Sequence, residues 1–283
     1  MPIPAVTIDG QRKDPEAASV SVFDRGFQYG DGVFETLAVV GGRVRELEAH
    51  MDRLGEGAEL LGIPAPDAGD LAADIDDLAG ELGTDTNAVI KVLYSRGRGG
   101  RGLAPPERPK PTRVIMRLAW PDHPPGWWRH GIRTITCTTH QVSGGALDGR
   151  IKSMNQINHI VARMEWQDPG VAEGLLCDQR GYVVEGTVTN VFAVFDGRVV
   201  TPDLTGSGLP GITRRRVLEI ADEPNGRSQL AALSPADLGE ADELFLTNSL
   251  VGIWPVASFD DRPFSAPGPV THKLQQALEA IYA

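Results

Sequence analysis

Cysteine is scarce in this 283-residue sequence, and it contains no long apolar run. The two cysteines, Cys137 and Cys177, each lie in an apolar, strand-like stretch and form no CxxC pair. This pattern favours buried, reduced thiols over a disulfide framework or a structural zinc site. No apolar run could cross a bilayer, and the first nine residues lack the basic flank and apolar core of a secretion signal. We therefore expect a cytoplasmic protein with neither a membrane partner nor a bound metal.

The balance of charge limits the possible partners further. The chain carries 38 acidic and 27 basic residues, which gives a formal net charge of −11. An acidic surface repels phosphates, so no nucleic-acid partner is expected. Much of the acid falls within residues 67–85, where its spacing indicates the solvated face of a helix. Against this background, a local cluster of arginines would be informative.

Apolar periodicity predicts strands and helices in both halves of the chain, joined by hairpins as well as crossovers. This mixture favours an α/β fold with mixed rather than purely parallel sheets. The proline-rich stretch Pro121–Gly126 is the best candidate for a domain linker. Strands are expected at residues 33–40, 88–94, 113–119, 132–138, 174–177, 191–195 and 243–247, and helices at 50–61, 71–82, 153–167, 211–221 and 270–282.

Two residues could carry chemistry in the second half of the chain. Lys152 lies in Arg150-Ile-Lys-Ser-Met-Asn155, just before a predicted helix. A lysine held against apolar groups can act as a nucleophile or base, although most lysines are surface charges. Glu185 ends an apolar strand and is followed by small polar residues. It could face a ring nitrogen or a cation, and the loop after it could offer N–H groups to an anion; an ordinary strand turn is the competing interpretation.

Two further segments have the composition of an anion site. Residues 211–213, Gly-Ile-Thr, open a predicted helix, where free N–H groups and the positive end of the helix dipole favour a phosphate. A capped helix with a basic exposed face explains the same residues equally well. Residues 247–249, Thr-Asn-Ser, interrupt an apolar strand and could bind a phosphate or carboxylate, or simply end the strand.

Taken in order, these segments resemble the fold type IV pyridoxal-phosphate enzymes, the group of branched-chain aminotransferases, D-amino acid transaminases and aminodeoxychorismate lyases. The resemblance includes the stretch Asp24–Glu35 and Arg53, and it runs from about Ile8 to the C-terminal helix. It implies a homodimer of two-domain subunits with the D-amino acid transaminase-like fold, in which the larger domain carries Lys152. The implied segments are a smaller N-terminal domain at residues 1–118, a linker at 119–126 and a larger C-terminal domain at 127–283.

The resemblance also implies pyridoxal 5'-phosphate as cofactor. Lys152 would hold it as a Schiff base, and Glu185 would keep its pyridine nitrogen protonated, so that the ring acts as an electron sink. The residues implied around its phosphate are Arg53, Thr189, Ile212, Thr213 and Ser249.

Within this group, residues 95–102, 151–159 and 247–256 look like aminodeoxychorismate lyase, whereas D-amino acid transaminases tend to have Tyr in place of Phe34 and His in place of Leu103. The implied reaction converts 4-amino-4-deoxychorismate to p-aminobenzoate and pyruvate, on the pathway to folate, and Lys152 would move the proton at the amine-bearing carbon. Arginines of the 95–102 loop would meet the two substrate carboxylates. The residues implied in substrate binding are Phe34, Arg98, Arg101 and Asn248, with Arg96 as a further candidate.

Two alternatives use the same residues differently. An aminotransferase acting on D-amino acids or branched-chain amino acids would share the cofactor and Lys152 and differ only in its substrate pocket. A catalytically inactive scaffold is the other alternative, and the joint presence of Arg53, Lys152 and Glu185 argues against it.

Overall fold

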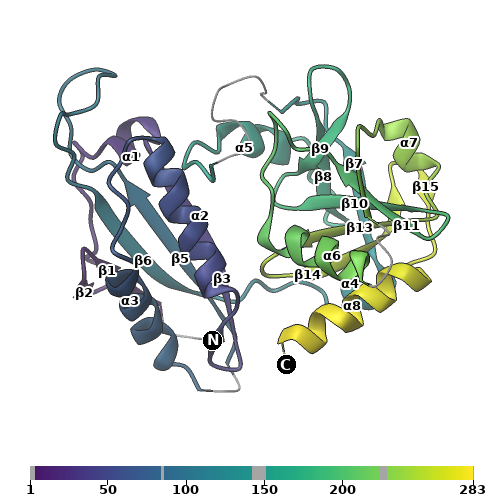
Figure 1. Cartoon of the computed structure of the whole chain (residues 1–283), viewed down its shortest axis with the longest axis horizontal. Coiled ribbons are helices and arrows are strands. Elements are labelled where there is room, and N and C mark those ends of the chain that lie inside the picture. The colour runs from purple at the N-terminus through teal and green to yellow at the C-terminus, as the bar shows by residue number, and fades with distance from the viewer. Residues whose placement is uncertain (1–3, 84–85, 142–150, 224–227, 283) are drawn as a thin grey trace. The chain divides into compact units, whose positions relative to one another are not determined.

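The computed structural model describes residues 4–83, 86–141, 151–223 and 228–282. The chain forms two compact units, the first comprising Met1–Asp122 with Ile151–Asn155, and the second His123–Arg150 with Gln156–Ala283 (Figure 1). The division falls within residues 119–126. Lys152 belongs to the first unit, not to the second domain predicted for it, because the segment around it pairs with a strand of the first unit.

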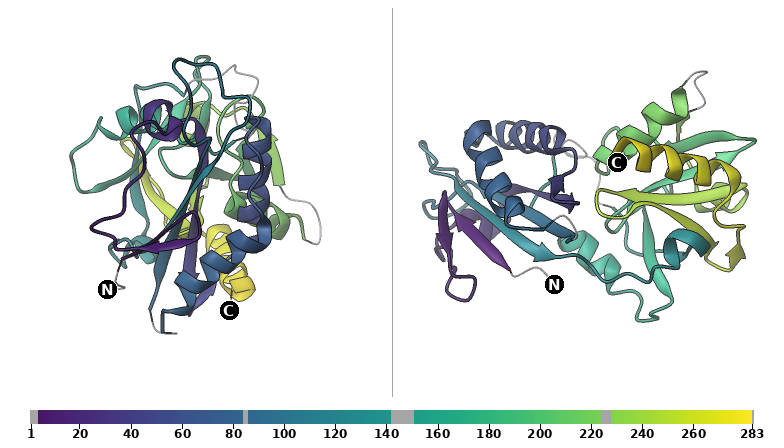
Figure 2. Two further views of the ribbon diagram at one scale, coloured as in Figure 1. Left: turned by 90° about the vertical axis from the view of Figure 1, so that its left-hand side faces the viewer. Right: turned by 90° about the horizontal axis from the view of Figure 1, so that it is seen from below.

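The first unit is built on a six-stranded antiparallel sheet with the strand order β2-β1-β6-β5-β3-β4. Helices α2 and α3 pack on this sheet and on each other, on the same face (Figures 1 and 2). The strands are β1 (Ala5–Ile8), β2 (Gln11–Lys13), β3 (Gly32–Val40), β4 (Arg43–Val44), β5 (Ala88–Ser95) and β6 (Thr112–Ala119), and the helices are α1 (Arg25–Tyr29), α2 (Leu47–Leu60) and α3 (Ala68–Gly80).

The core of the first unit follows from the alternation of apolar side chains along its central strands. Leu37, Ile90 and Ile115 from β3, β5 and β6 are fully buried, and they join Leu54 of α2 and Ile75 of α3 in one cluster. The acidic residues of α3 lie mostly on its solvated side, as the sequence predicted. The helices and sheet thus form a two-layer unit with β6 and β5 at the centre of the sheet.

The Lys152 segment forms a short extra strand-like pairing beside β3. The Phe34 N–H donates to the Lys152 carbonyl at 2.9 Å, and the Met154 N–H donates to the Gly32 carbonyl at 2.9 Å. Gly32 is required here, because a Cβ at this position would lie 2.6 Å from the Tyr94 carbonyl oxygen and 2.7 Å from Met154 Sδ. The backbone of Lys152 is therefore fixed to the strand that carries Phe34.

The second unit has a nine-stranded mixed sheet with the path β12-β11-β10-β13-β14-β7-β8-β9, and β15 pairs with β14. Three strand pairs, β11–β12, β14–β7 and β7–β8, are parallel, which confirms the predicted mixed sheet. The strands are β7 (Ile132–Thr136), β8 (Val171–Cys177), β9 (Val183–Gly186), β10 (Asn190–Phe195), β11 (Arg198–Pro202), β12 (Ser228–Ala231), β13 (Glu243–Asn248), β14 (Gly252–Phe259) and β15 (Arg262–Pro263), and the helices are α4 (Trp127–His130), α5 (Ile157–Arg163), α6 (Ile212–Asp222), α7 (Pro235–Gly239) and α8 (Pro269–Tyr282).

Both faces of the central strands of this sheet are apolar and covered. Phe192 of β10 stacks on Phe245 of β13 with ring centroids 4.8 Å apart, on the face covered by α6 and α8 (Figure 1). Val191 and Leu246, one position along each strand, belong to the cluster on the opposite face. A near-continuous apolar run is typical of a strand buried on both sides. This explains why these strands could be predicted from the sequence.

Two expectations about buried groups have different outcomes. Cys137 and Cys177 are free and buried, as predicted, and burial raises the pKa of the Cys137 thiol to about 12, so it is unreactive at neutral pH. The helix predicted at residues 153–167 is wrong in extent, because α5 spans only Ile157–Arg163. Its apolar face, predicted from helical spacing, is 46–68% exposed in the chain, over Ile157, Ile160, Val161 and Met164.

Helices long and apolar enough to cross a membrane are absent from the part of the chain that the structure describes.

Candidate functional site

Lys152 lies against an aromatic ring. Its Nζ is 4.6 Å from the centroid of the Phe34 ring, and Nζ of Lys91, on the neighbouring strand β5, is 5.4 Å from the same centroid. Cation–π contacts of this kind contribute about 0.5–1 kcal/mol each at exposed sites. The strand register places Lys91 opposite Thr36, so two ammonium groups gather at one part of β3. Sequence reasoning missed Lys91, because a lone lysine in an apolar strand carries no distinctive pattern.

Arg53 belongs to a buried ionic triad in the first unit. Its Nε lies 2.7 Å from Glu35 Oε1 and its Nη2 2.8 Å from Glu35 Oε2, a two-pronged pairing, while His50 Nδ1 lies 2.7 Å from the same Oε2. Burial raises the pKa of Glu35, but hydrogen bonds from His50 and Arg53 outweigh it and lower the pKa to about 2. Glu35 therefore holds Arg53 in one orientation at neutral pH.

Neither partner of Arg53 was predicted from the sequence. His50 and Arg53 are three residues apart on α2, so they lie on the same side of the helix, and Glu35 is the one acidic residue of the apolar strand β3. A charged residue inside a buried strand nearly always has a partner. That signal could have identified Glu35 as part of a site, although not which cation it pairs with.

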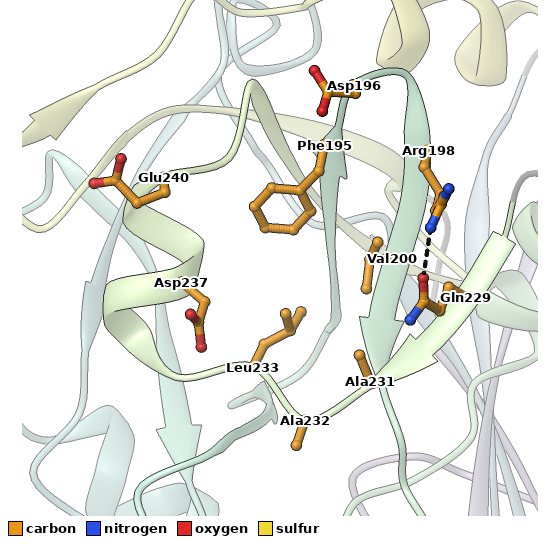
Figure 3. Close-up of a pocket in the computed structure, with 10 residues that line it drawn as sticks. All are labelled: Phe195, Asp196, Arg198, Val200, Gln229, Ala231, Ala232, Leu233, Asp237 and Glu240. Atoms are coloured by element: carbon orange, nitrogen blue, oxygen red, sulfur yellow. Dashed lines mark hydrogen bonds between the residues drawn. The ribbon is translucent and has the colours of Figure 1, made fainter.

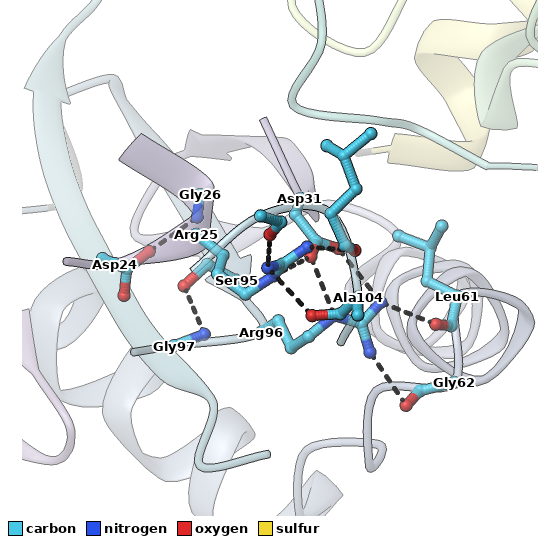
Figure 4. A network of polar contacts seen from close by, with 12 residues as sticks. Asp24, Arg25, Gly26, Asp31, Leu61, Gly62, Ser95, Arg96, Gly97 and Ala104 are labelled. Atoms are coloured by element: carbon cyan, nitrogen blue, oxygen red, sulfur yellow. Dashed lines mark hydrogen bonds and ion pairs between the residues drawn. The ribbon is translucent and has the colours of Figure 1, made fainter. Parts of the chain in front are cut away.

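A second ionic cluster fixes the arginine-rich loop (Figure 4). Asp31 accepts from Arg25 Nε at 2.7 Å and from Arg96 Nε and Nη2 at 2.8 and 3.0 Å. Arg96 also donates to the carbonyls of Leu61 at 2.8 Å and Gly62 at 3.1 Å. Burial raises the pKa of Asp31, but hydrogen bonds from Arg96 and Arg25 reverse this effect and lower it. Arg96 is thus a buried structural residue, which corrects its suggested role in binding substrate.

The far end of the same loop is held by Arg25. Its guanidinium donates to the carbonyls of Gly102 and Leu103, each at 3.0 Å. Arg96 therefore holds the start of the loop and Arg25 holds its end, and both arginines pair with the Asp31 carboxylate. Between these ties, Arg98 and Arg101 are exposed, and the Arg98 guanidinium lies 5.6 Å from the Phe23 ring centroid. Arg98 and Arg101 are the arginines of the loop presented to solvent.

Glu185 lies in the second unit, at the end of β9, and its side chain is buried. Its Oε2 accepts from the Leu209 N–H at 2.9 Å. Its Oε1 accepts from Gln141 Nε2 at 3.2 Å and lies 3.4 Å from His159 Nε2. Each carboxylate oxygen has two lone-pair directions, and these contacts hold the plane of the carboxylate in one orientation.

The turn after Glu185 is organised from within by a second buried glutamate. Glu173 Oε1 accepts from the Thr187 N–H at 3.1 Å, and its Oε2 accepts from the Val188 N–H and the Thr189 hydroxyl, each at 3.1 Å. Burial raises the pKa of Glu173. The acceptor that these N–H groups contact is therefore the Glu173 carboxyl group, a correction to the expectation that they are offered to a ligand. The role of Thr189 beside the phosphate stays a prediction.

The start of α6 has the features of an anion site. Gly211 precedes the helix in an extended conformation, and its N–H donates to Asn190 Oδ1 at 3.1 Å. A Cβ at Gly211 would lie 2.2 Å from that oxygen, so only glycine fits. Ile212 and Thr213 form the first turn and are buried, and the helix dipole makes this end positive. The buried Arg214, which donates to the Pro202 carbonyl at 2.9 Å, adds to the positive potential.

Asn248 closes the turn between β13 and β14. Its Oδ1 accepts from the N–H groups of Leu250 and Val251, each at 2.9 Å, and its Nδ2 donates to the Val188 carbonyl at 3.3 Å. These bonds connect the turn containing Ser249 to the turn after Glu185. They give Asn248 a structural role, and its predicted contact with substrate stays a prediction.

A surface cavity of about 460 Å³ in the second unit contains none of the predicted site residues (Figure 3). It lies between β10, β11, β12 and α7, and Arg198 on its wall donates to Gln229 Oε1 at 3.2 Å. We assign it no part in the chemistry.

The predicted residues thus form two groups, each coherent within its own unit. The first unit brings together Phe34 and Lys152 and orients Arg53 through Glu35. The second unit links Glu185 to Leu209, three residues before the start of α6, and joins the turn at Thr189 to Asn248.

Comparisons with known proteins cover nearly the whole chain. Residues 32–259 match the family Amino-transferase class IV. The chain is 36% identical over 278 residues to a putative branched-chain-amino-acid aminotransferase of Methanocaldococcus jannaschii, covering 98% of this chain and 96% of the relative. It is 34% identical over 262 residues to the aminodeoxychorismate lyase of Vibrio harveyi, covering 92% and 95%. The crystal structure of 4-amino-4-deoxychorismate lyase from Pseudomonas aeruginosa matches with a TM-score of 0.89 and 40% identity, covering 97% of this chain and 98% of that one.

Proposed function

Because the chain belongs to the class IV aminotransferase family, whose members are pyridoxal-phosphate enzymes, we propose that it is the lyase that converts 4-amino-4-deoxychorismate to p-aminobenzoate and pyruvate. The relatives include both a lyase and a branched-chain aminotransferase at similar identity. The choice between these reactions therefore depends on the residues that would meet the substrate.

The observation that supports the lyase is the pair of exposed arginines on a fixed loop. Arg98 and Arg101 are presented to solvent, while Arg25, Asp31 and Arg96 hold the backbone on either side of them. In a protein of net charge −11, such a local positive group suits a substrate with two carboxylates. A branched-chain amino acid has one carboxylate and an apolar side chain, so a second arginine would have no carboxylate to pair with.

The residues present fit the cofactor. When bound, pyridoxal 5'-phosphate supplies an aldehyde carbon that an amine can attack and a ring that accepts electrons. We propose that Lys152 provides the amine and that Glu185, held by Leu209 and Gln141, faces the pyridine nitrogen. The uncapped start of α6 at Ile212 has the polarity that a phosphate requires. The remaining residues proposed around that phosphate are Arg53, Thr189, Thr213 and Ser249.

Lys152 is also the proposed proton carrier. With the cofactor and substrate bound, Nζ of Lys152 would take the proton from the amine-bearing carbon of the substrate and would later serve as an acid. The backbone bond from Phe34 to the Lys152 carbonyl fixes the base of this side chain, so only its flexible end has to move. Loss of the enolpyruvyl group leaves an aromatic ring, which makes the elimination favourable.

We further propose that the protein acts as a cytoplasmic homodimer. The exposed apolar face of α5 and a second set of exposed apolar side chains in the first unit are unusual for a monomer, and free buried thiols suit a reducing compartment. That second set consists of Val20, Val22, Phe23, Phe27 and Tyr29. Sedimentation of the wild-type protein as a monomer at micromolar concentration would contradict the dimer.

A direct assay tests the lyase. The purified, cofactor-loaded protein should release p-aminobenzoate and pyruvate in equal amounts from 4-amino-4-deoxychorismate, measured by chromatography and by a coupled pyruvate assay. Lys152→Ala should abolish both products, whereas Lys13→Ala, at an exposed lysine of β2, is the matched control and should keep them. Normal pyruvate release by Lys152→Ala would refute the role of Lys152.

An aminotransferase is the second candidate, favoured by the 36% identity to the Methanocaldococcus relative. Incubation with a branched-chain amino acid or D-alanine plus 2-oxoglutarate should give glutamate if this alternative holds. Glutamate formation without release of p-aminobenzoate would replace the lyase assignment and leave the cofactor site intact.

A further inference from the structure

Glu185 has a titratable neighbour that the proposed reaction does not use. His159, in α5, places its Nε2 3.4 Å from Glu185 Oε1. The imidazole is mostly buried, and its other nitrogen, Nδ1, is buried without a hydrogen-bond partner among the residues that the structure describes. A histidine beside a buried carboxylate can change the charge of that site near neutral pH.

Residues on the inner face of α5 are hydrogen-bonded to groups around Glu185. Asn158, next to His159, donates to Gln141 Oε1 and to the His140 carbonyl, each at 3.0 Å. Gln141 in turn donates to Glu185 Oε1 at 3.2 Å. Two consecutive residues of this short helix therefore reach the same carboxylate oxygen, one directly and one through Gln141.

The two ring nitrogens of His159 have different surroundings. With its proton on Nε2, the neutral ring donates to Glu185 and leaves only an acceptor at Nδ1. Protonation would add an N–H at Nδ1 that has no acceptor among the described residues, as well as a charge. A buried donor without a partner is destabilising, because it loses its hydrogen bond to water and gains none in the protein. The Nε2–H tautomer is therefore the one that can donate to Glu185 without leaving a buried donor at Nδ1.

We propose that His159 is a positioning residue for Glu185 and makes the hold of this site on the pyridine nitrogen of its cofactor dependent on pH. This inference rests on the role of Glu185 in the proposed function. Neutral His159 orients the carboxylate by one hydrogen bond. Cationic His159 competes with the protonated ring for the same negative charge, so acid weakens the bond between Glu185 and the cofactor.

Four other charged or titratable groups lie near this pair: Arg214, Glu173, Glu165 and the exposed His140, which precedes Gln141. Burial lowers the pKa of Arg214 of α6, but a guanidinium stays cationic at neutral pH, and its charge interacts electrostatically with Glu185. Glu173 of β8, the strand on which α5 packs, is held by Thr187 and by the turn that follows it. Glu165, beyond the end of α5, accepts from the N–H groups of residues 138 and 139.

The test measures cofactor affinity rather than turnover. Apoenzyme is titrated with pyridoxal 5'-phosphate by tryptophan fluorescence at about pH 8 and about pH 5.5, on either side of the range in which imidazoles titrate. The measured quantity is the ratio of Kd at the lower pH to Kd at the higher pH within each variant. Titration of the free cofactor and of its phosphate affects all variants alike, so differences between these ratios report on the protein.

The expected result separates charge from orientation. The ratio should be about fivefold smaller in His159→Gln than in wild type, because the amide can donate but cannot become cationic. His159→Ala should bind about fivefold more weakly than wild type at the higher pH, and His159→Gln should recover part of that loss. His272→Gln, at an exposed histidine of α8, is the matched control and should keep the wild-type ratio.

Two results would overturn the inference: equal ratios in wild type and His159→Gln, or a difference between them that persists when Glu185→Gln is added to both. Thermal unfolding of each variant, measured first, shows that the comparison is made on folded protein. A chain that binds the cofactor with the expected ratios but forms no p-aminobenzoate would refute the lyase and leave the role of His159 standing. A wild-type chain that binds no cofactor would refute both.

Discussion

The two units bury a glutamate each beside the residues proposed for catalysis, and they stabilise it in opposite ways. Glu35 in the first unit is paired with Arg53 and His50, and its pKa falls to about 2. Glu173 in the second unit is at least as deeply buried, but its partners are neutral N–H and O–H groups, and burial raises its pKa. Equal burial therefore gives opposite shifts, and the charge of the partner decides the sign.

The difference suits what each glutamate does. An ionic pair fixes a long, flexible arginine side chain, and it does so only while the carboxylate stays ionised. Neutral donors from successive backbone groups fix the path of a turn, which requires many short bonds rather than one strong one. The first unit thus orients a side chain, and the second unit shapes a backbone.

Removal of the charge of Glu35 should have the largest effect. Glu35→Gln leaves Arg53 buried without its counter-charge, and the loss of one partner of a buried ion pair costs about 3–5 kcal/mol of unfolding free energy. Urea unfolding monitored by circular dichroism measures it. Glu56→Gln, at an exposed position of the same helix as Arg53, is the control. A loss below about 1 kcal/mol would show that Glu35 contributes packing rather than charge.

The pH dependence of stability tests the same pair. The folded pKa of Glu35, about 2, is below its ordinary value of 4.5, so the contribution of its charge to stability is fully present above pH 4.5 and is lost as the pH falls towards 2. Wild type should therefore lose stability relative to Glu35→Gln over this interval, by about 3 kcal/mol in total. Parallel curves for the two proteins between pH 4.5 and 2 would contradict the lowered pKa.

Asp31 extends the comparison to a carboxylate shared by two arginines. Asp31→Asn should bring Arg25 and Arg96 together without a counter-charge and cost about 2–3 kcal/mol, less than for Glu35 because Asp31 is less buried. The loop between them should open, so trypsin should cleave after Arg98 and Arg101 faster than in wild type. Cleavage at an unchanged rate would mean that the loop is held by other contacts.

Glu173→Gln should have the smallest effect and the opposite dependence on pH. The amide nitrogen would face the Val188 N–H, at a cost of about 1–2 kcal/mol. Because the folded pKa of Glu173 is raised, wild type loses stability as the pH rises from 4.5 through the folded pKa. The difference in free energy of unfolding between wild type and Glu173→Gln should therefore become smaller over that range. A difference that becomes larger would indicate an ionised Glu173.

Regular elements were predictable where one periodicity dominated. Strands such as β3, β5 and β10 agree with their predicted positions to within one residue, because their apolar, β-branched composition leaves no alternative. The edge strands β2 and β12 and the short helices α1 and α7 were missed, since elements of three to five residues carry too few positions to show a period. The spacing of Ile157, Ile160, Val161 and Met164 predicts one apolar face, but only the structure shows that this face is exposed.

The sequence by itself determined the family and the set of chemically capable residues, because Lys152, Glu185 and Arg53 lie in stretches whose order and residue types can be recognised without a structure. Only the tertiary structure decided which of them are free to act and which are engaged. Arg96 and Asp31 are 65 residues apart in the chain and 2.8 Å apart in space. Pairing at that range depends on how strands and helices pack. Three neighbouring arginines, each followed by glycine, therefore differ: Arg96 is buried in an ion pair, whereas Arg98 and Arg101 are exposed.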